Sequence, residues 1–257
     1  MTSFKEKWQF FWKNVWESFK SSLLAMIMFF AASSCVFLVT LQEDMCGKLS
    51  EGLNFARWAW IIGAAVVAML YNGFIAYANG GQGYEMLVSG NMKRMSAERL
   101  GTPMKMSSHK EEKEYRDWKG FVSGAWIGLI VLLSGLFMGA NGDQINLAMA
   151  DLDNDVTLGT GTVIMVFIVF LLSGWSVMPF FFANMGGFAV SYYWSCFLAL
   201  APILVTGIFY IVGAYGRRNK AIKAQEQADA ASRAQQQKPQ KINYGGLPGT
   251  KPNKKKK

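Results

Sequence analysis

The residue types that most often carry catalysis or bind metals are scarce in this chain, which has one histidine and three cysteines among 257 residues. His109 stands in a charged stretch, "HKEEKEYRDWKG", whereas Cys35 and Cys196 lie inside long apolar runs and Cys46 follows the first of them. Catalysis needs a titratable group beside the reacting atom, and a metal site needs several His, Cys or carboxylate ligands together. We therefore predict no catalytic residue, no metal site and no cofactor.

Three short patterns come close to functional signatures without completing them. The glycines of "GGQGYE", residues 80–85, fit neither the dinucleotide nor the P-loop spacing, and no strand precedes them. The Ser-Gly pairs in the apolar blocks would need a histidine in the membrane to act as nucleophiles. The run "DLDND", residues 151–155, begins like an EF-hand loop, but Val156 and Thr162 replace its Gly and Glu. We favour a solvated acidic loop, with weak calcium binding as the alternative.

Five apolar blocks dominate the sequence, which is 52% hydrophobic and 17% charged. None of them contains Asp, Glu, Lys, Arg or His, and about 20 apolar residues of helix suffice to cross the hydrocarbon core. They cover residues 23–41, 58–77, 120–140, 163–182 and 188–213. The predicted fold class is all-α: a polytopic membrane helical bundle of four to five transmembrane helices over residues 23–215.

The third block carries glycines at helical spacing. They are Gly120, Gly124, Gly128, Gly135 and Gly139. At 100° per residue these five positions share one arc of about 100°. Small residues let helix backbones approach closely in lipid, where apolar burial supplies no attraction. We predict a helix-packing face, covered by another helix of this chain or, as the alternative, by a second subunit.

The loop charges define an orientation. Lysines precede the first block, the loop of residues 78–119 holds eight basic residues, and the tail of residues 216–257 holds twelve. The loop of residues 141–162 has four Asp and no basic residue. By the positive-inside rule, both termini and loop 78–119 are cytoplasmic and loop 141–162 is extracytoplasmic.

Five full crossings would place the two termini on opposite sides, so the charges and the block count disagree. The apolar pattern is interrupted around residues 174–187, as expected where a helix kinks or turns back. The interrupting residues are Gly174, Pro179, Asn184, Gly186 and Gly187. We predict four full crossings plus one re-entrant or broken segment here; five plain crossings with the tail outside are the alternative.

Two segments outside the blocks suit the membrane surface. In residues 1–22, Phe4, Trp8, Phe11, Val15 and Phe19 form one stripe opposite charged residues, which predicts an interfacial amphipathic helix. The tail of residues 216–257 is basic and largely disordered by composition, and its lysines would attract anionic lipid headgroups. Nucleic acid is disfavoured as a partner, because the tail offers a single aromatic residue for base stacking.

A short cytoplasmic helix is predicted from about residue 84 to residue 99. It would dock on anionic lipid headgroups or, as the alternative, on an acidic partner protein. Its docking residues are Tyr84, Leu87, Val88, Lys93, Arg94, Met95 and Arg99.

Coupled transporters usually carry ionisable residues inside the membrane, and these apolar blocks have none. We therefore expect a non-catalytic subunit, permease-like or scaffold, of a larger membrane transport, export or assembly complex in a prokaryotic plasma membrane. The partners would be other membrane subunits or a cytoplasmic protein bound to loop 78–119. The alternative is a homo-oligomeric passive pore, lined by Asn72, Asn184 and backbone carbonyls.

Overall fold

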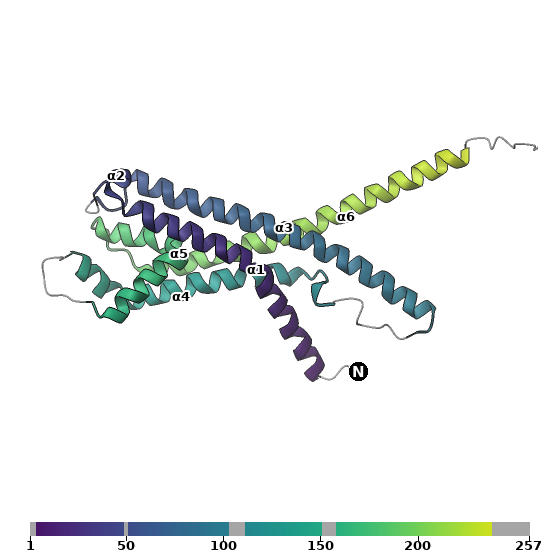
Figure 1. Ribbon diagram of the computed structural model, residues 1–257, viewed down its shortest axis with the longest axis horizontal. Helices are drawn as coiled ribbons and strands as arrows, with labels where there is room; N and C mark the ends of the chain where they lie inside the picture. The colour runs from purple at the N-terminus through teal and green to yellow at the C-terminus, as the bar shows by residue number, and fades with distance from the viewer. Residues whose placement is uncertain (1–3, 49–50, 103–110, 151–157, 238–257) are drawn as a thin grey trace, which may run out of the picture. The chain divides into compact units, whose positions relative to one another are not determined.

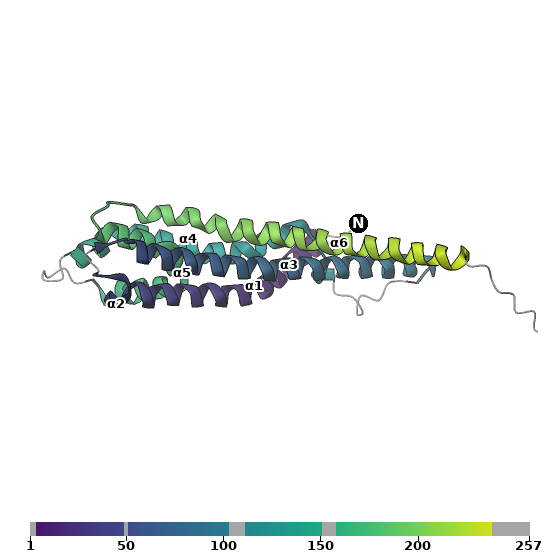
Figure 2. The same ribbon diagram turned by 90° about the horizontal axis from the view of Figure 1, so that it is seen from above.

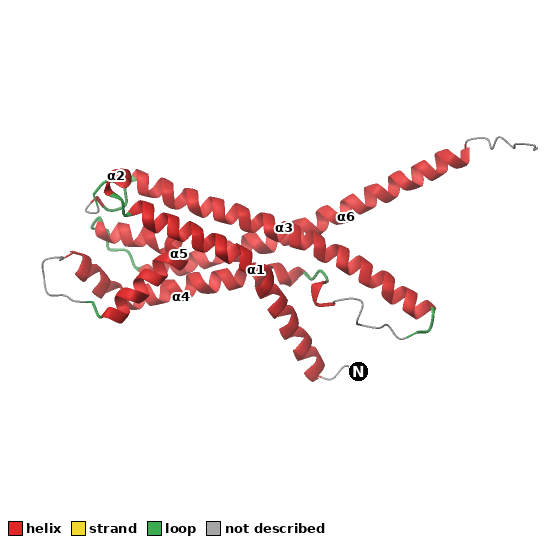
Figure 3. Cartoon of the chain, in the orientation of Figure 1, coloured by secondary structure: helices red, strands yellow, loops and turns green. Residues whose placement is uncertain are grey.

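The structure, a computed structural model, describes residues 4–48, 51–102, 111–150 and 158–237, and these ranges contain helices and loops but no strand (Figure 3). In chain order the helices are α1 (Phe4–Thr40), α2 (Glu43–Cys46), α3 (Phe55–Arg99), η3 (Glu111–Lys113), α4 (Asp117–Ala150), α5 (Thr160–Met185), η4 (Tyr192–Ala199) and α6 (Leu200–Gln237). The described residues include five helices that are long and apolar enough to cross a membrane. The all-helical class predicted from the sequence is thus confirmed.

The chain divides into two compact units, Met1–Arg217 and Arg218–Lys257. The first unit is a helical bundle (Figures 1 and 2). The described part of the second unit is the end of α6, whose side chains are exposed as far as residue 233.

Helices α1 and α4 run in the same direction. In the first half of both, Ser123 Oγ donates a hydrogen bond to Ser18 O at 2.9 Å, and towards their ends Val36 and Ile145 lie in one buried cluster. We call the end of the bundle at Ser18 the near end, and the end at Thr40 the far end.

Helices α3 and α6 run the opposite way, from the far end to the near end. Arg57, at the start of α3, donates to Thr40 O at 3.2 Å. Further along, Asn72 Nδ2 of α3 donates to Thr206 Oγ1 of α6 at 2.8 Å. At the near end Glu85 of α3 pairs with Arg217 at 3.3 Å.

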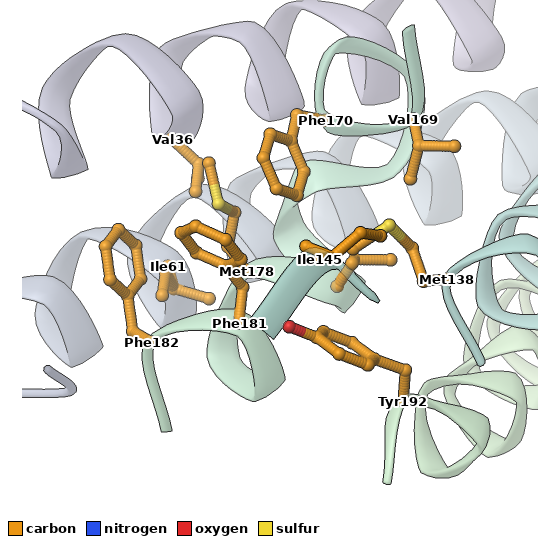
Figure 4. Close-up of a cluster of buried hydrophobic side chains, with 11 residues drawn as sticks. Val36, Ile61, Met138, Ile145, Val169, Phe170, Met178, Phe181, Phe182 and Tyr192 are labelled. Carbon is orange, nitrogen blue, oxygen red and sulfur yellow. The ribbon is translucent and has the colours of Figure 1, made fainter. Parts of the chain in front are cut away.

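Two apolar clusters fill the bundle. One is formed by Ala25, Phe29, Ala68, Ile127, Val131, Trp175 and Ala199 at mid-height. The larger one lies towards the far end and contains Val36, Ile61, Met138, Ile145, Val169, Phe170, Val177, Met178, Phe181, Phe182 and Tyr192 (Figure 4). The far half of the bundle is therefore packed with large apolar side chains.

The outer face of α1 is more apolar than its inner face in the first half of the helix. Asn14, Ser18 and Ser22 are buried, whereas Trp8, Trp12 and other aromatic residues are exposed. This distribution is the inverse of that in a water-soluble bundle, where the apolar stripe faces the core.

Several element boundaries differ from the expected ones. Residues 4–22 and the first block lie in the single helix α1, and block 58–77 continues without a break through residues 84–99 in α3. Helix α4 extends to Ala150, and α6 runs through the first part of the supposedly disordered tail to Gln237. The prediction ended helices where apolar composition ends, but backbone hydrogen bonds continue through charged and glycine residues. The predicted disorder of residues 238–257, the "DLDND" run and His109 lie outside the described residues.

Candidate functional site

All five glycines of the predicted packing face lie against η4 and α6 of the same chain. A Cβ atom placed on Gly120, Gly124, Gly128, Gly135 or Gly139 would stand 2.5 to 2.7 Å from an atom of η4 or α6. Real Cβ atoms do not approach other heavy atoms so closely, and any side chain here would separate the helices. The surface that the sequence singled out is therefore already covered within the chain.

A second glycine contact, between α3 and α6, did not emerge from the sequence. A Cβ on Gly80 would overlap the carbonyl oxygen of Tyr210, and a Cβ on Gly213 would overlap that of Tyr77. The two glycines thus allow reciprocal backbone contacts at one crossing. The glycines at 80, 81 and 83, which resemble no complete phosphate-binding motif, serve close helix packing.

Helix α5 breaks sharply at Ser173, whose backbone angles are φ −140° and ψ 27°. The rings of Phe170 and Phe181 lie 5.0 Å apart, although eleven residues of straight helix would separate them by about 16 Å. Figure 4 shows both rings in the far cluster, together with Met178 and Phe182. The second half of α5 therefore folds back along the first.

Both ends of α5 lie at the far end of the bundle. Leu158, just before α5, packs against the far cluster. At the other end, a Cβ on Gly52, in the loop between α2 and α3, would overlap the backbone of Gly186. The elbow points inward, where the rings of Trp175 and Phe29 are 5.6 Å apart.

The residues predicted to interrupt this segment have separate roles. Gly174 lies at the elbow against Ser33 O of α1, and Pro179 is inside the second half of α5. The amide of Asn184 binds the backbone of Val190 twice: Nδ2 donates to O at 2.9 Å, and Oδ1 accepts from N at 2.7 Å. Gly187 has a φ of 84°, which favours glycine. Asn184 thus fixes the turn after α5 and does not line an open passage.

Arg57 is a buried residue that the sequence analysis did not single out. Its guanidinium donates to the carbonyl oxygens of Thr40, Gly47, Lys48 and Gly52 and stacks on Phe182, 4.8 Å from the ring centroid. Its charge is thus bound by main-chain oxygens. These contacts tie the α1–α3 connection to the end of α5. The only feature of the sequence that could have pointed to Arg57 was its position directly before the apolar block 58–77.

The predicted docking residues divide into two groups. Tyr84, Leu87 and Arg94 are half-buried, and Arg94 pairs with Glu114 at 2.6 Å and with Glu111 at 3.5 Å. Val88, Lys93, Met95 and Arg99 are exposed. The structure adds Met92 to the exposed group, where Met92 and Met95 are 61% and 54% accessible.

A polar cavity of about 170 Å³ lies at the near end, between α1, α3, α4, α6 and η3. Its polar lining comprises Glu17, Ser18, Ser21, Ser22, Asn72, Asn79, Gln82, Glu112, Lys113, Lys119, Ser123, Thr206 and Tyr210. The exposed residues Gln82 and Lys113 form its mouth. No sequence motif indicated this cavity, because its polar residues are scattered over five helices that are distant in sequence.

The segment between η3 and α4 closes one side of the cavity. Lys119 Nζ donates to the carbonyl oxygens of Glu112 and Glu114. Tyr115 stacks on Tyr210 with ring centroids 5.3 Å apart, and its backbone N donates to Gly83 O. Burial, with the Asp117 carboxylate beside it, raises the pKa of Tyr115 well above its ordinary value.

In the part of the chain that the structure describes, no three His, Cys, Asp or Glu side chains come together in a way that could hold a metal ion. The fold and the site define an all-helical protein with five helices suited to crossing a membrane and a polar cavity at one end of its bundle. No protein-family model, curated protein or solved structure matches the chain.

Proposed function

We propose that this chain is a multi-pass membrane protein in which α1, α3, α4 and α6 cross the bilayer and α5 is re-entrant. Exposed aromatic residues support the crossings: Trp58 and Tyr77 bound the apolar part of α3, and Trp194 and Tyr215 bound that of η4 and α6. At 1.5 Å per residue in an α-helix and 2.0 Å in a 3-10 helix, the two spacings are about 28 Å and about 34 Å, close to the 30 Å thickness of the hydrocarbon core. Tyr and Trp favour its two interfaces.

The re-entrant assignment rests on the elbow of α5. Its Trp175 contacts Phe29, which lies about halfway along α1 between Trp16 and Thr40. The elbow thus reaches the middle of the proposed membrane while both ends of α5 remain at the far end. Four crossings then bring the chain back at Arg217 to the side on which it starts. The near end, which carries the basic loop, is cytoplasmic by the positive-inside rule.

At the near end, the first turns of α1 suit the interfacial role expected from the sequence. Phe4, Trp8 and Phe11 are exposed, and an exposed aromatic stripe on a helix with lysines is typical of the headgroup layer.

The projecting part of α3 supports the role of a complex subunit. Helix α3 has 45 residues, which span about 67 Å, so the 22 residues after Tyr77 extend about 33 Å past the bilayer. Met92 and Met95 are then more than about 20 Å from the membrane boundary, beyond the headgroups. Exposed apolar side chains in water mark an interaction surface. This stripe, Val88, Met92 and Met95, is the observation that carries the proposal.

We define the α3 stripe as Val88, Met92 and Met95, with Lys93 and Arg99 beside it. Its occupant is an acidic cytoplasmic protein or subunit, because basic residues flank the apolar side chains. The homo-oligomeric pore is less well supported: the five glycines of α4 are covered by α6, and Asn72 and Asn184 are bound to Thr206 and Val190.

Affinity purification from the native host tests this role. We expect the full chain to retain a partner at fixed stoichiometry and the Met92→Glu/Met95→Glu variant to lose it, because an acidic charge would face an acidic surface. Ala97→Glu, about 180° away around the helix from Val88, is the matched control and should retain the partner. Recovery of the unmodified chain alone, as a homo-oligomer, would contradict the proposal.

A further inference from the structure

The polar cavity at the near end has a mouth and a floor. Gln82, Glu112 and Lys113 lie at the mouth, and Asn72, Thr206 and Ser22 lie deeper in the bundle. Beyond the floor come the mid-height cluster with Ala25 and Ala68 and then the far cluster. An apolar pocket of about 210 Å³ lies at mid-height, lined by Phe29, Ile127, Val131 and Trp175 among others, and large apolar side chains fill the bundle from there to the far end. The cavity is therefore a pocket entered from the near side and not an arm of a continuous passage.

The hydroxyl groups on α1 and α4 that line the cavity already donate hydrogen bonds within the protein. Ser18 Oγ donates to Asn14 O at 2.9 Å, and Ser22 Oγ donates to Phe19 O at 2.7 Å. Ser21 and Ser123 each bind Ser18 O and lie 2.8 Å from one another. Since a hydroxyl has one proton and two lone pairs, these oxygens can only accept further hydrogen bonds.

The side chains at the floor of the cavity also present hydrogen-bond acceptors. Thr206 Oγ1 donates to Pro202 O at 2.5 Å, so it must accept from Asn72 Nδ2, 2.8 Å away. This arrangement assigns the amide orientation of Asn72 and leaves its Oδ1 as an acceptor. Hydroxyl and amide oxygens from α1, α3, α4 and α6 therefore converge on the cavity as acceptors.

Two carboxylates and two ammonium groups line the cavity, so their formal charges cancel. Glu17 and Glu112 line it as carboxylates. Lys119 lines it too, but its ammonium group donates to two main-chain carbonyl oxygens of the segment after α3. Lys113 is exposed at the mouth. The acceptors in the lining are thus the serine, threonine and Asn72 oxygens and the Glu17 carboxylate, which also lies 3.7 Å from Lys20 Nζ. Asn79, Gln82 and Tyr210 add donor groups nearer the mouth.

We propose that this cavity binds a small soluble primary amine in its ammonium form. Three N–H donors on one positive centre match an array of acceptor oxygens, and charge-assisted hydrogen bonds are the stronger kind. With about 170 Å³, and roughly 30 Å³ for each water in the liquid, the cavity holds an amine of a few non-hydrogen atoms. The ligand enters from the near side.

Isothermal titration of the full chain in detergent with ethanolamine and with choline tests this inference. Both probes are small alcohols with one positive charge, but choline has no N–H donor. We expect ethanolamine to bind in the millimolar range or tighter and choline not to bind. Equal binding of the two probes, or no binding of ethanolamine at millimolar concentrations, would overturn the proposal.

Two variants locate the bound amine. Ser22→Ala removes one acceptor and should weaken ethanolamine binding by about tenfold, the typical effect of a hydrogen bond to a charged group; Glu17→Gln should weaken it further. Ser176→Ala is the matched control, because Ser176 is a buried helical serine that donates to Ser173 O away from the cavity. Unchanged affinity in Ser22→Ala and Glu17→Gln, with both variants folded by their thermal transitions, would refute the site.

Discussion

At the scale of single residues, buried polar side chains in this bundle bind main-chain carbonyl oxygens. Thr40 Oγ1 donates to Val36 O, Thr206 Oγ1 donates to Pro202 O, and Arg57 binds four carbonyls at the far end. Such local bonds satisfy a polar group without a charged partner, which matters where water is absent. Ser33 Oγ and Trp175 Nε1, beside the elbow of α5, are buried without a partner in the described part of the chain.

Arg57 provides the prediction at this scale. Arg57→Met leaves its carbonyl partners without donors and should lower the free energy of unfolding by about 3 kcal/mol. The free energy of unfolding of Arg57→Lys should lie between those of Arg57→Met and the unmodified chain, because an ammonium group cannot match the planar donor array of a guanidinium group. Unfolding in increasing denaturing detergent measures the change. Arg99→Met, at an exposed position, is the control; an equal loss in both variants would contradict the role of Arg57.

At the scale of helices, the glycine pattern was informative, whereas helix lengths were not. Spacings of four and seven residues in the third block predicted a close packing face, and α4 meets η4 and α6 there. Hydropathy could not predict that α1 and α3 continue beyond their apolar blocks, because it marks where the apolar residues end and not where the helix ends. The covering helix was also unpredictable, since any helix with small residues could have fitted.

Substitution of one glycine tests the α4–α6 contact. Gly124→Leu would press against Pro202 O and Ile203 Cα of α6 and should lower the free energy of unfolding by about 2 kcal/mol or more. Gly63→Leu is the matched control, because a Cβ on Gly63 of α3 meets no atom within 4 Å. It should leave stability unchanged or raise it by up to about 1 kcal/mol through helix propensity. Thermal unfolding in detergent distinguishes them, and similar transitions would contradict the contact.

At the scale of the whole molecule, the loop charges place both termini on one side of the membrane, whereas five crossings would place them on opposite sides. A re-entrant α5 leaves four crossings and would remove this disagreement. The sequence predicted a re-entrant or broken segment near residues 174–187, and the non-helical angles of α5 fall at Ser173, just before it. It could not reveal how far the chain turns, because that depends on Phe170 and Phe181 meeting in the far cluster. The cavity was equally hidden, since Ser22, Asn72 and Ser123 are distant in sequence and ordinary in type.

The most direct test of this account is cysteine labelling of α5 from one side of the membrane. The three native cysteines are first replaced by alanine, and two cysteines are introduced singly: Gly161→Cys in the first turn of α5 and Phe188→Cys just after its last residue. The account predicts that a membrane-impermeant maleimide added outside intact cells labels both positions. Labelling of one position from outside and of the other only after permeabilisation would show that α5 crosses the membrane, and would contradict the account.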